Sequence, residues 1–287
     1  MNHDRGATAP TPTFGVPTPD AAGATAGWSA AALPIGDDGV LQPVQCCPSR
    51  RRAAPGRNEV HVWFADFGRD EADAGRFRSL LDPHERARAD RLAVPRLHTR
   101  FVRAHGLLRL VLAAYAGDSP ANLRFTAGHH GKPALADRAG ISFSLSGAGD
   151  AVAIAVAHGC EVGIDIEEAT PVGDADELVA RYFSPRELAA YRSLPGNLRG
   201  TAFPRLWTRK EAFVKGIGRG LAYPLDAFSV GLGVPVELHG RDTGSWSLRH
   251  VEPGPDFAAA LAVRHEHPSL AGGWLQFGAG TQVHAGF

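Results

Sequence analysis

The sequence has few cysteines, no excess of charge and no long apolar run, and each of these absences excludes a class of protein. Cys46, Cys47 and Cys160 form an odd set without zinc-finger spacing, so a disulfide framework is not predicted. Lysine and arginine together number 30, as do aspartate and glutamate. Because the formal charge is zero, no general attraction to nucleic acid or to a membrane follows.

The sequence also lacks a recognisable targeting or membrane-spanning segment. No apolar run is long enough to cross a bilayer. The first residues lack the basic and then apolar pattern of a signal peptide, so we expect a cytoplasmic protein. The 287 residues, of which 44% are hydrophobic, suffice for one large or two small globular domains.

The N-terminal segment differs in composition from the rest of the chain. Residues 1–56 are rich in Ala, Pro, Gly and Thr, as in the run from Ala9 to Thr13. Such a composition buries too little apolar surface to offset the conformational entropy of the chain. We therefore predict a disordered extension over residues 1–56, followed by a folded part that begins near Asn58.

Periodicity and capping signals predict the elements of the folded part. Asp82, Pro83 and Glu85 have the order of a helix start, and Ser184 with Glu187 has the spacing of a capping box. Helices are predicted over residues 76–81, from 82 onward, 99–115, 184–194 and 203–216, and strands over 59–65, 123–125, 151–157, 162–167, 228–230, 245–248 and 258–263. The turn at residues 158–159 predicts that the strands on either side of it form a hairpin.

The strand at residues 162–167 carries two carboxylates on one face. Its apolar residues are Val162, Ile164 and Ile166, and they alternate with Gly163, Asp165 and Glu167. Alternate side chains share a face in a strand, so Asp165 and Glu167 lie together and repel each other. A hard divalent ion such as Mg²⁺ would relieve that repulsion. A solvated face of an edge strand is an equally good interpretation of the spacing alone.

A second stretch places a third carboxylate on a helix. Trp207, Glu211 and Lys215 lie four residues apart on one ridge, and Lys210 stands beside that ridge. Taken alone, Glu211 and Lys215 are typical of an exposed ion pair of small energy. Trp207 at the head of the ridge indicates that this side of the helix faces protein rather than water.

Together the two stretches resemble the signature motifs of the surfactin-type 4′-phosphopantetheinyl transferases. The first motif, G-[IV]-D-[IVL]-E, is present from Gly163 to Glu167. The second, W-x-x-K-E-[SA]-x-x-K, is present from Trp207 to Lys215. The order and separation of the two motifs also match the family, and the resemblance covers roughly Asn58 to Val263.

The resemblance implies a set of site residues. The implied ligands of Mg²⁺ are Asp165, Glu167 and Glu211. The implied catalytic residues are Asp165, Lys210, Glu211 and Lys215, with Glu211 as the candidate general base. The implied contacts of coenzyme A are Arg88, Arg100, Lys132, Pro133, Ser146, Gly147, Lys210 and Lys215, where Lys132 and Pro133 belong to a Gly-Lys-Pro motif.

One position departs from the family pattern. Relatives read F-N-[IL]-S-H-S-G-D where this chain has Phe143 to Asp150, and Gly147 stands in place of the histidine that helps to hold the coenzyme A phosphates. The substitution removes one donor to an anionic ligand, which costs about 1.5–3 kcal/mol where nothing compensates. We expect a weaker affinity for coenzyme A or a shifted phosphate position.

The resemblance also implies a fold and a reaction. The fold class is α+β, with two pseudo-symmetric halves at residues 57–162 and 163–287. The implied reaction moves the 4′-phosphopantetheine arm of coenzyme A to a serine of an acyl or peptidyl carrier protein, with Mg²⁺, in a monomer that binds neither nucleic acid nor membrane. Three alternatives stay open at this point: a catalytically impaired homologue that binds carrier protein or coenzyme A, an unrelated Mg²⁺-dependent phosphohydrolase, and a globular scaffold without chemistry.

Overall fold

The structure is a computed structural model that describes residues 52–68, 74–128, 130–138 and 140–275. All of these described residues belong to one compact unit. The extension predicted over residues 1–56 therefore lies almost entirely outside the described residues. Within it, Pro55 is already buried, and the Arg52 guanidinium lies 4.3 Å from the centre of the Trp63 ring. The packed part of the chain thus includes residues before the predicted start at Asn58.

The N-terminal half contains three helices and five strands among its described residues. These are β1 (Glu59–Asp66), α1 (Ala74–Arg78), α2 (Pro83–Asp90), α3 (Pro95–Ala116), β2 (Phe125–Ala127), β3 (Pro133–Leu135), β4 (Ile141–Ala148) and β5 (Ala151–His158). The capping box predicted at the start of α2 is present, because Asp82 accepts from the Glu85 amide at 2.8 Å and Glu85 accepts from the Asp82 amide at 3.1 Å.

The rest of the described chain continues with β6 (Val162–Glu168), α4 (Ala175–Tyr182), α5 (Pro185–Ser193), α6 (Gly196–Ile217), β7 (Phe228–Val230), β8 (Leu238–Gly240), β9 (Ser247–Val251), β10 (Phe257–Val263) and β11 (Ser269–Trp274). The capping box predicted at Ser184 opens α5. Helix α6 begins seven residues before the predicted start at residue 203 and contains Pro204. Its first turns are stabilised by tertiary packing of Ala202, Phe203 and Leu206, which local periodicity does not reveal.

The strands form two main sheets. The first has the order β11-β1-β5-β4, and the second has the order β6-β10-β9. The predicted hairpin between β5 and β6 is wrong, since β5 pairs with β1 and β4 whereas β6 pairs with β10. The physical reason is that β5 and β6 contribute side chains to the same core from different sheets, so they pack face to face instead of edge to edge.

Alternation along β5 builds two of the three cores. Val152, Ile154 and Val156 pack with α1 and α3 on one side of the first sheet. The alanines of β5, from Ala151 to Ala157, face a core between the two sheets that also contains Ile164. Small side chains allow the sheets to approach closely there, and a third core lies between the second sheet and helices α4 to α6.

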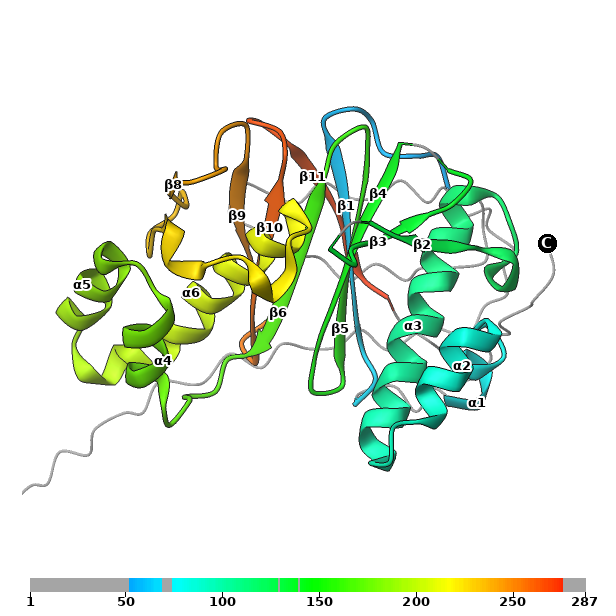
Figure 1. Cartoon of the computed structure of the whole chain (residues 1–287), viewed down its shortest axis with the longest axis horizontal. Coiled ribbons are helices and arrows are strands. Elements are labelled where there is room, and N and C mark those ends of the chain that lie inside the picture. Colours follow the sequence, from blue (N-terminus) through cyan, green and yellow to red (C-terminus); the bar gives the residue numbers. More distant parts are fainter. Residues whose placement is uncertain (1–51, 69–73, 129, 139, 276–287) are drawn as a thin grey trace, which may run out of the picture. The chain divides into compact units, whose positions relative to one another are not determined.

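The two halves have the same arrangement of a long helix on a sheet. Helix α3 packs on the first sheet and α6 on the second, on the outer sides of the two sheets (Figure 1). The predicted α+β class with two similar halves is confirmed. Over the residues that the structure describes, no helix combines the length and the apolar character that crossing a bilayer requires.

The last strand does not stay with the half that precedes it. Strand β11 pairs in parallel with β1, from Glu59 opposite Ser269 to Phe64 opposite Trp274. Gly272 has a φ of 147°, and a Cβ there would lie 1.8 Å from the Val62 carbonyl oxygen, so only glycine fits. The sheet of the N-terminal half therefore needs a strand from residues 163–287, which the predicted boundary assigns to the other half.

Candidate active site

Strand β6 presents its two carboxylates toward helix α6. Val162, Ile164 and Ile166 are buried in the core between the sheets, as the alternation predicts. On the opposite face, Asp165 is only 3% exposed and Glu167 is half-buried. Burial of Asp165 excludes the alternative of a solvated strand face, because an exposed carboxylate needs no partner and a buried one does.

A close contact of backbones sets the position of α6 against β6. A Cβ on Gly163 would lie 2.1 Å from the Ala212 carbonyl oxygen and 2.2 Å from the Gly216 nitrogen. A Cβ on Gly216 would lie 2.6 Å from the Trp246 ring. Glycine at both positions therefore lets the helix lie directly on the strand, and this contact brings the Glu211 turn of α6 beside Asp165.

Lys215 completes a polar triangle that joins the two halves. Its Nζ lies 2.6 Å from Asp165 Oδ1 and 2.8 Å from Ser146 Oγ. The Ser146 hydroxyl in turn donates to Asp165 Oδ1 at 2.7 Å. A second serine of β4, Ser144, accepts from the Ile164 amide at 3.1 Å. Strand β4 of one half and strand β6 of the other thus hold the site between them.

The three carboxylates influence one another electrostatically. Burial raises the pKa of Asp165, and Lys215 and Ser146 oppose the shift. The pKa of Glu167 rises to about 7, first through burial and then through the charges of Asp165 and Glu211. Burial and the Asp165 charge raise the pKa of Glu211, against the effect of Lys215. Such shifts indicate a cluster whose negative charge is not balanced by protein groups.

Two carboxylate oxygens in this cluster have no hydrogen-bond partner. Asp165 Oδ2 and Glu211 Oε1 are both buried and unpaired. A buried carboxylate oxygen without a partner is costly, so both atoms fit a cation ligand. The described residues nevertheless contain no group of three His, Cys, Asp or Glu side chains already placed to hold a metal ion. The donor chemistry therefore suits a hard divalent ion, although the three side chains are not yet gathered as ligands.

Lys210 is not brought to this cluster. Its side chain is fully buried, with Nζ 2.7 Å from both carboxylate oxygens of Glu187 and 2.9 Å from the Phe228 carbonyl oxygen. Burial lowers the pKa of Lys210, and the Glu187 charge opposes that shift. Glu187 also accepts from the Val230 amide at 2.9 Å. The geometry therefore favours a structural link between α5, α6 and β7 over the phosphate contact predicted for Lys210.

The Gly-Lys-Pro motif is likewise engaged by the protein itself. Lys132 Nζ forms an ion pair with Glu161 and donates to the carbonyl oxygens of Val162 at 3.1 Å and Gly216 at 2.8 Å. Pro133 begins β3 directly after it. Lys132 thus connects the loop before β3 with the start of β6 and the end of α6, close to the glycine contact described above.

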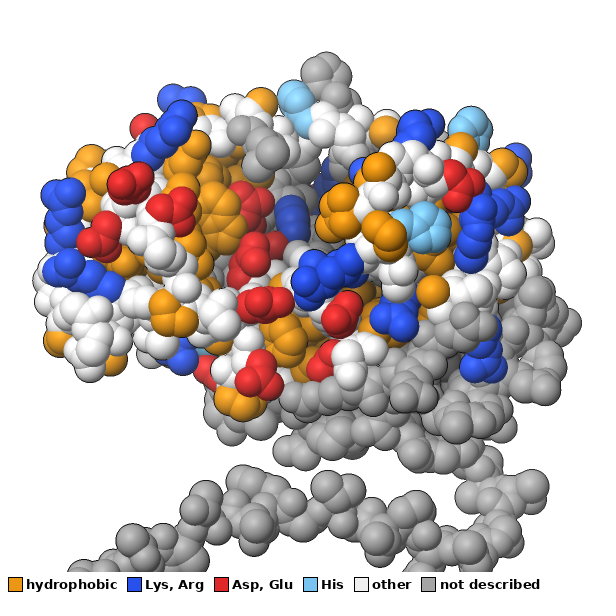
Figure 2. Space-filling view, turned by 90° about the horizontal axis from the view of Figure 1, so that it is seen from below, with side chains coloured by type: hydrophobic (Ala, Val, Ile, Leu, Met, Phe, Trp, Pro, Cys, Tyr) orange, Lys and Arg blue, Asp and Glu red, His pale blue; other side chains and the backbone are white. Residues whose placement is uncertain are grey.

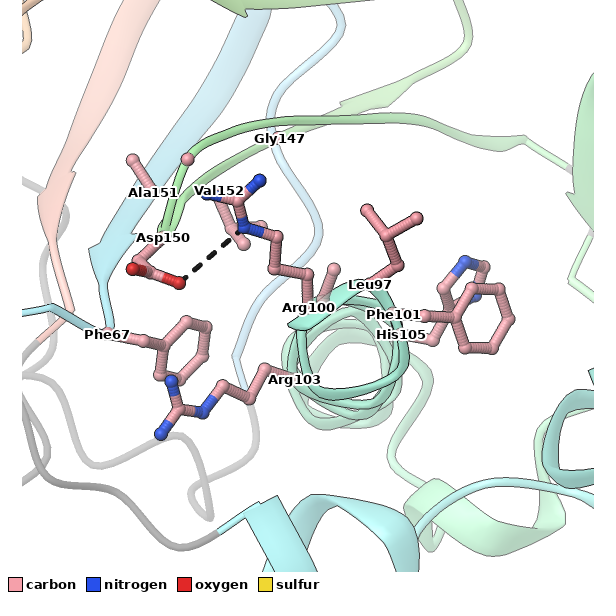
Figure 3. A pocket seen from close by; sticks show the side chains of 12 residues that line it. Phe67, Leu97, Arg100, Phe101, Arg103, His105, Gly147, Asp150, Ala151 and Val152 are labelled. Atoms are coloured by element: carbon pink, nitrogen blue, oxygen red, sulfur yellow. Dashed lines mark ion pairs between the residues drawn. The ribbon is translucent and has the colours of Figure 1, made fainter. Parts of the chain in front are cut away.

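A pocket of about 320 Å³ lies between α3 and the turn that joins β4 to β5, and it is lined by two further predicted residues, Arg100 and Gly147. Figure 3 shows Arg100 projecting from α3 toward Asp150 in the turn between β4 and β5, whereas Phe101 projects from the other side of the helix. Arg100 Nε lies 3.7 Å from Asp150 Oδ1 across this pocket. Gly147 lines this pocket from β4, whereas its neighbour Ser146 points to the opposite face of the strand, where it meets Asp165 and Lys215.

Arg88 lies on the outer side of this pocket region. It is exposed, and its guanidinium lies 5.1 Å from the centre of the Phe101 ring. Phe101 is itself a pocket residue, so Arg88 neighbours the pocket without lining it.

Figure 2 shows acidic and basic side chains gathered around a hollow in the visible face, which is the molecule of Figure 1 seen from below.

Sequence reasoning missed the carboxylates that engage the predicted cations. Glu187, Glu161 and Asp150 pair with Lys210, Lys132 and Arg100 respectively. The sequence predicts only a capping-box role for Glu187, which it does have. Glu161 lies two residues before the first motif, but the sequence does not place it beside residue 132.

Comparison with known proteins identifies the family. The family model of the 4′-phosphopantetheinyl transferase superfamily matches residues 161–267, which span β6 to the end of β10. The chain belongs to this superfamily, and its activity is 4′-phosphopantetheinyl transfer.

Individual relatives match over most of the chain. The 4′-phosphopantetheinyl transferase HetI of Nostoc sp. is 35% identical over 210 residues, which cover 72% of this chain and 88% of the relative. The 4′-phosphopantetheinyl transferase Sfp of Bacillus subtilis is 29% identical over 211 residues, or 72% of this chain and 92% of the relative. The unrelated phosphohydrolase and the scaffold without chemistry are thereby excluded.

Proposed function

We propose that the protein transfers the 4′-phosphopantetheine arm of coenzyme A to a serine of an acyl or peptidyl carrier protein, in a reaction that depends on Mg²⁺. The serine oxygen forms a bond to the phosphorus that carries the pantetheine arm. The bond between that phosphorus and the bridging oxygen breaks, and adenosine 3′,5′-bisphosphate leaves. Both halves of the site lie in one chain, so we also propose that the monomer is the active form.

The observation that carries this proposal is the pair of buried, unpartnered oxygens on Asp165 and Glu211 beside Lys215. Asp165, Glu167 and Glu211 would hold Mg²⁺, and the bound ion would neutralise part of the negative charge of the pyrophosphate. Residues 163–287 would thus provide the metal site, and residues 57–162 would provide contacts to coenzyme A through Arg100, Ser146 and Gly147.

The residues of the chain then divide the remaining tasks. Lys215, which is partly exposed and contacts Asp165 and Ser146, would place positive charge beside the phosphates as charge develops on the leaving oxygen. Glu211 would accept the proton of the attacking serine, directly or through water. Lys132 and Pro133 would shape the coenzyme A side from the start of β3.

The direct test is intact-protein mass spectrometry of an apo-carrier protein mixed with this protein, coenzyme A and Mg²⁺. We expect a mass gain of one phosphopantetheine arm that disappears when EDTA is added. Several carrier types, acyl and peptidyl, should be offered. If no carrier gains this mass, while calorimetry still detects binding of coenzyme A to the protein, the result would favour the alternative of an impaired homologue that only binds carrier protein or coenzyme A.

Proton binding at Glu167 makes a prediction about pH. Between about pH 4.5 and pH 7 the folded protein keeps a proton on Glu167 that the unfolded chain has lost, so without metal the stability should fall as pH rises through this window. Mg²⁺ competes with that proton for Glu167. The affinity of the site for Mg²⁺ should therefore rise with pH, by about tenfold for each pH unit up to pH 7. Melting temperatures measured with EDTA and with Mg²⁺ from pH 5 to pH 8 check both trends. In Glu167→Gln both pH trends should be weaker, and full retention of them would assign the titration to another group.

The departure at Gly147 makes a second prediction. A Cβ at this position would meet only the Ala151 carbonyl oxygen, at 3.4 Å, and the pocket lies beside it. Gly147→His should therefore fit and should tighten coenzyme A binding about tenfold through one added donor. Isothermal calorimetry measures the change, with Gly147→Ala as the control for the added Cβ alone. Equal affinities of the two variants would mean that the chain already compensates for the missing histidine.

A further inference from the structure

A second polar cluster lies on the flank of α6 that faces away from Asp165. Asp165 on β6 lies opposite Ala260 of β10, and Ala260 lies opposite His250 of β9. Directly opposed residues of an antiparallel sheet share a face, and Ala260 belongs to the core that α6 covers. Asp165 and His250 therefore lie on the helix-covered face of the second sheet, over its two opposite edges (Figure 1).

The cluster over β9, here called the outer cluster, consists of Arg205, Arg209, His250 and Glu252. Arg209 and Glu211 are two residues apart in α6, so they lie on opposite sides of the helix. Glu252 Oε1 lies 3.8 Å from Arg205 Nη2 and 2.8 Å from His250 Nε2. Among the residues that the structure describes, Glu252 is the carboxylate that forms ion pairs with this cluster, and it serves two partners.

Arg209 is the member of the outer cluster without a counter-ion. It is only 1% exposed, and no carboxylate in the described part of the chain forms an ion pair with it. Its Nη1 donates to the Gly231 carbonyl oxygen, whereas its Nε is buried without an acceptor. Burial lowers the pKa of Arg209 to about 10, and the charge of Arg205 adds to the shift. One carbonyl oxygen does not neutralise a guanidinium group, and a buried cation without a counter-charge is costly.

A second buried atom of the outer cluster also lacks a partner. His250 Nε2 contacts Glu252, but Nδ1 is buried without a hydrogen bond. Burial lowers the pKa of His250; Glu252 opposes this shift, and the charges of Arg209 and Arg205 reinforce it. The cluster thus combines an excess of positive charge with two unpartnered nitrogens. An oxyanion would supply both the missing counter-charge and the missing acceptors.

We propose that the outer cluster binds a small oxyanion, with Arg209 and Arg205 as its cationic ligands and His250 as a further donor. The planar fork of a guanidinium group matches the oxygens of a phosphate or carboxylate. Arg205 and Glu252 are both partly exposed, so the anion enters between them. Because the outer cluster and the carboxylates of the proposed metal site lie on different flanks of α6, the inference does not depend on the proposed function.

Isothermal calorimetry with inorganic phosphate tests the site in the full-length protein. We expect the wild type to bind phosphate, and Arg209→Met and Arg205→Gln to bind it about tenfold more weakly. Arg249→Gln is the matched control and should not change the affinity, because Arg249 precedes His250 in β9 and lies on the other face of the strand. Arg100→Met should keep the binding, which distinguishes the outer cluster from the pocket at α3.

Two calorimetric results would overturn the proposal: equal phosphate affinity of the wild type and Arg209→Met, or no phosphate binding by the wild type. If Arg209→Met does not fold, Arg205→Gln decides the question by itself, since the Arg205 side chain is partly exposed and its loss leaves the core intact.

Stability measurements separate anion binding from a purely structural role of Arg209. Without phosphate, Arg209→Met should be at least as stable to urea as the wild type, because it removes a buried charge without a counter-ion. Phosphate should then raise the melting temperature of the wild type more than that of Arg209→Met. Equal rises would reflect a general salt effect and contradict the site. A loss of stability in Arg209→Met with unchanged phosphate binding would show that Arg209 only holds the Gly231 carbonyl oxygen.

Discussion

Replacing Asp165 by asparagine should reduce transfer about a thousandfold without lowering the stability of the metal-free protein. The variant keeps the shape of the side chain and its acceptor for Ser146 and Lys215, but it removes one charge from a cluster whose members raise each other's pKa. Relief of this repulsion should leave the free energy of unfolding equal or higher. Transfer rates and chemical denaturation of the same preparations measure the two effects.

The two measurements together separate a functional role of Asp165 from a structural one. Mg²⁺ should raise the melting temperature of the wild type and not that of Asp165→Asn. The control is Glu177→Gln, which neutralises an exposed carboxylate on α4 and should change neither quantity. Parallel losses of stability and transfer in Asp165→Asn would show that Asp165 supports the fold and not the reaction.

Lys210→Met should destabilise the protein by about 3–5 kcal/mol. The substitution removes the ammonium group that lies 2.7 Å from both Glu187 oxygens and leaves a fully buried carboxylate without its counter-charge. Glu187 would retain the amides of Ser184 and Val230 as donors, but these do not neutralise it. Denaturation by urea gives the change in free energy, and transfer by the folded fraction gives the change in rate.

A double variant makes the interpretation of this loss unambiguous. Lys210→Met combined with Glu187→Gln should recover part of the stability, because a neutral amide remains an acceptor for the Ser184 and Val230 amides without a buried charge. At a temperature where Lys210→Met is folded, its turnover should stay within about tenfold of the wild type. A stable Lys210→Met without transfer would instead restore the catalytic role predicted from the motif.

The sequence predicted those parts of the site that depend on local periodicity. Alternation in β6 placed Asp165 and Glu167 on one face, and helical spacing placed Glu211 and Lys215 on one ridge, since both patterns depend only on neighbours in the chain. Capping chemistry placed the starts of α2 and α5 for the same reason. Resemblance then supplied the family, which the comparisons confirm.

Properties that depend on distant residues could not be predicted in this way. Lys210 and Lys215 lie on the same helix, yet one is fully buried against Glu187 and the other reaches Asp165 and Ser146. Which lysine meets the site depends on how α5 and β7 pack around α6, and a motif does not encode that packing. The same reason explains the wrong hairpin, because the turn after β5 says nothing about which sheet the next strand joins.

The pairing of β11 with β1 has a consequence for synthesis on the ribosome. The chain emerges from its N-terminus, so β1 and β5 are available long before β11, which lies more than 200 positions after β1. One edge of β1 keeps unpaired amide and carbonyl groups throughout that interval, and such an edge invites association with other chains. The nascent protein therefore cannot close its first sheet until residues 269–274 have been made, and a chain released before that point would expose the edge of β1.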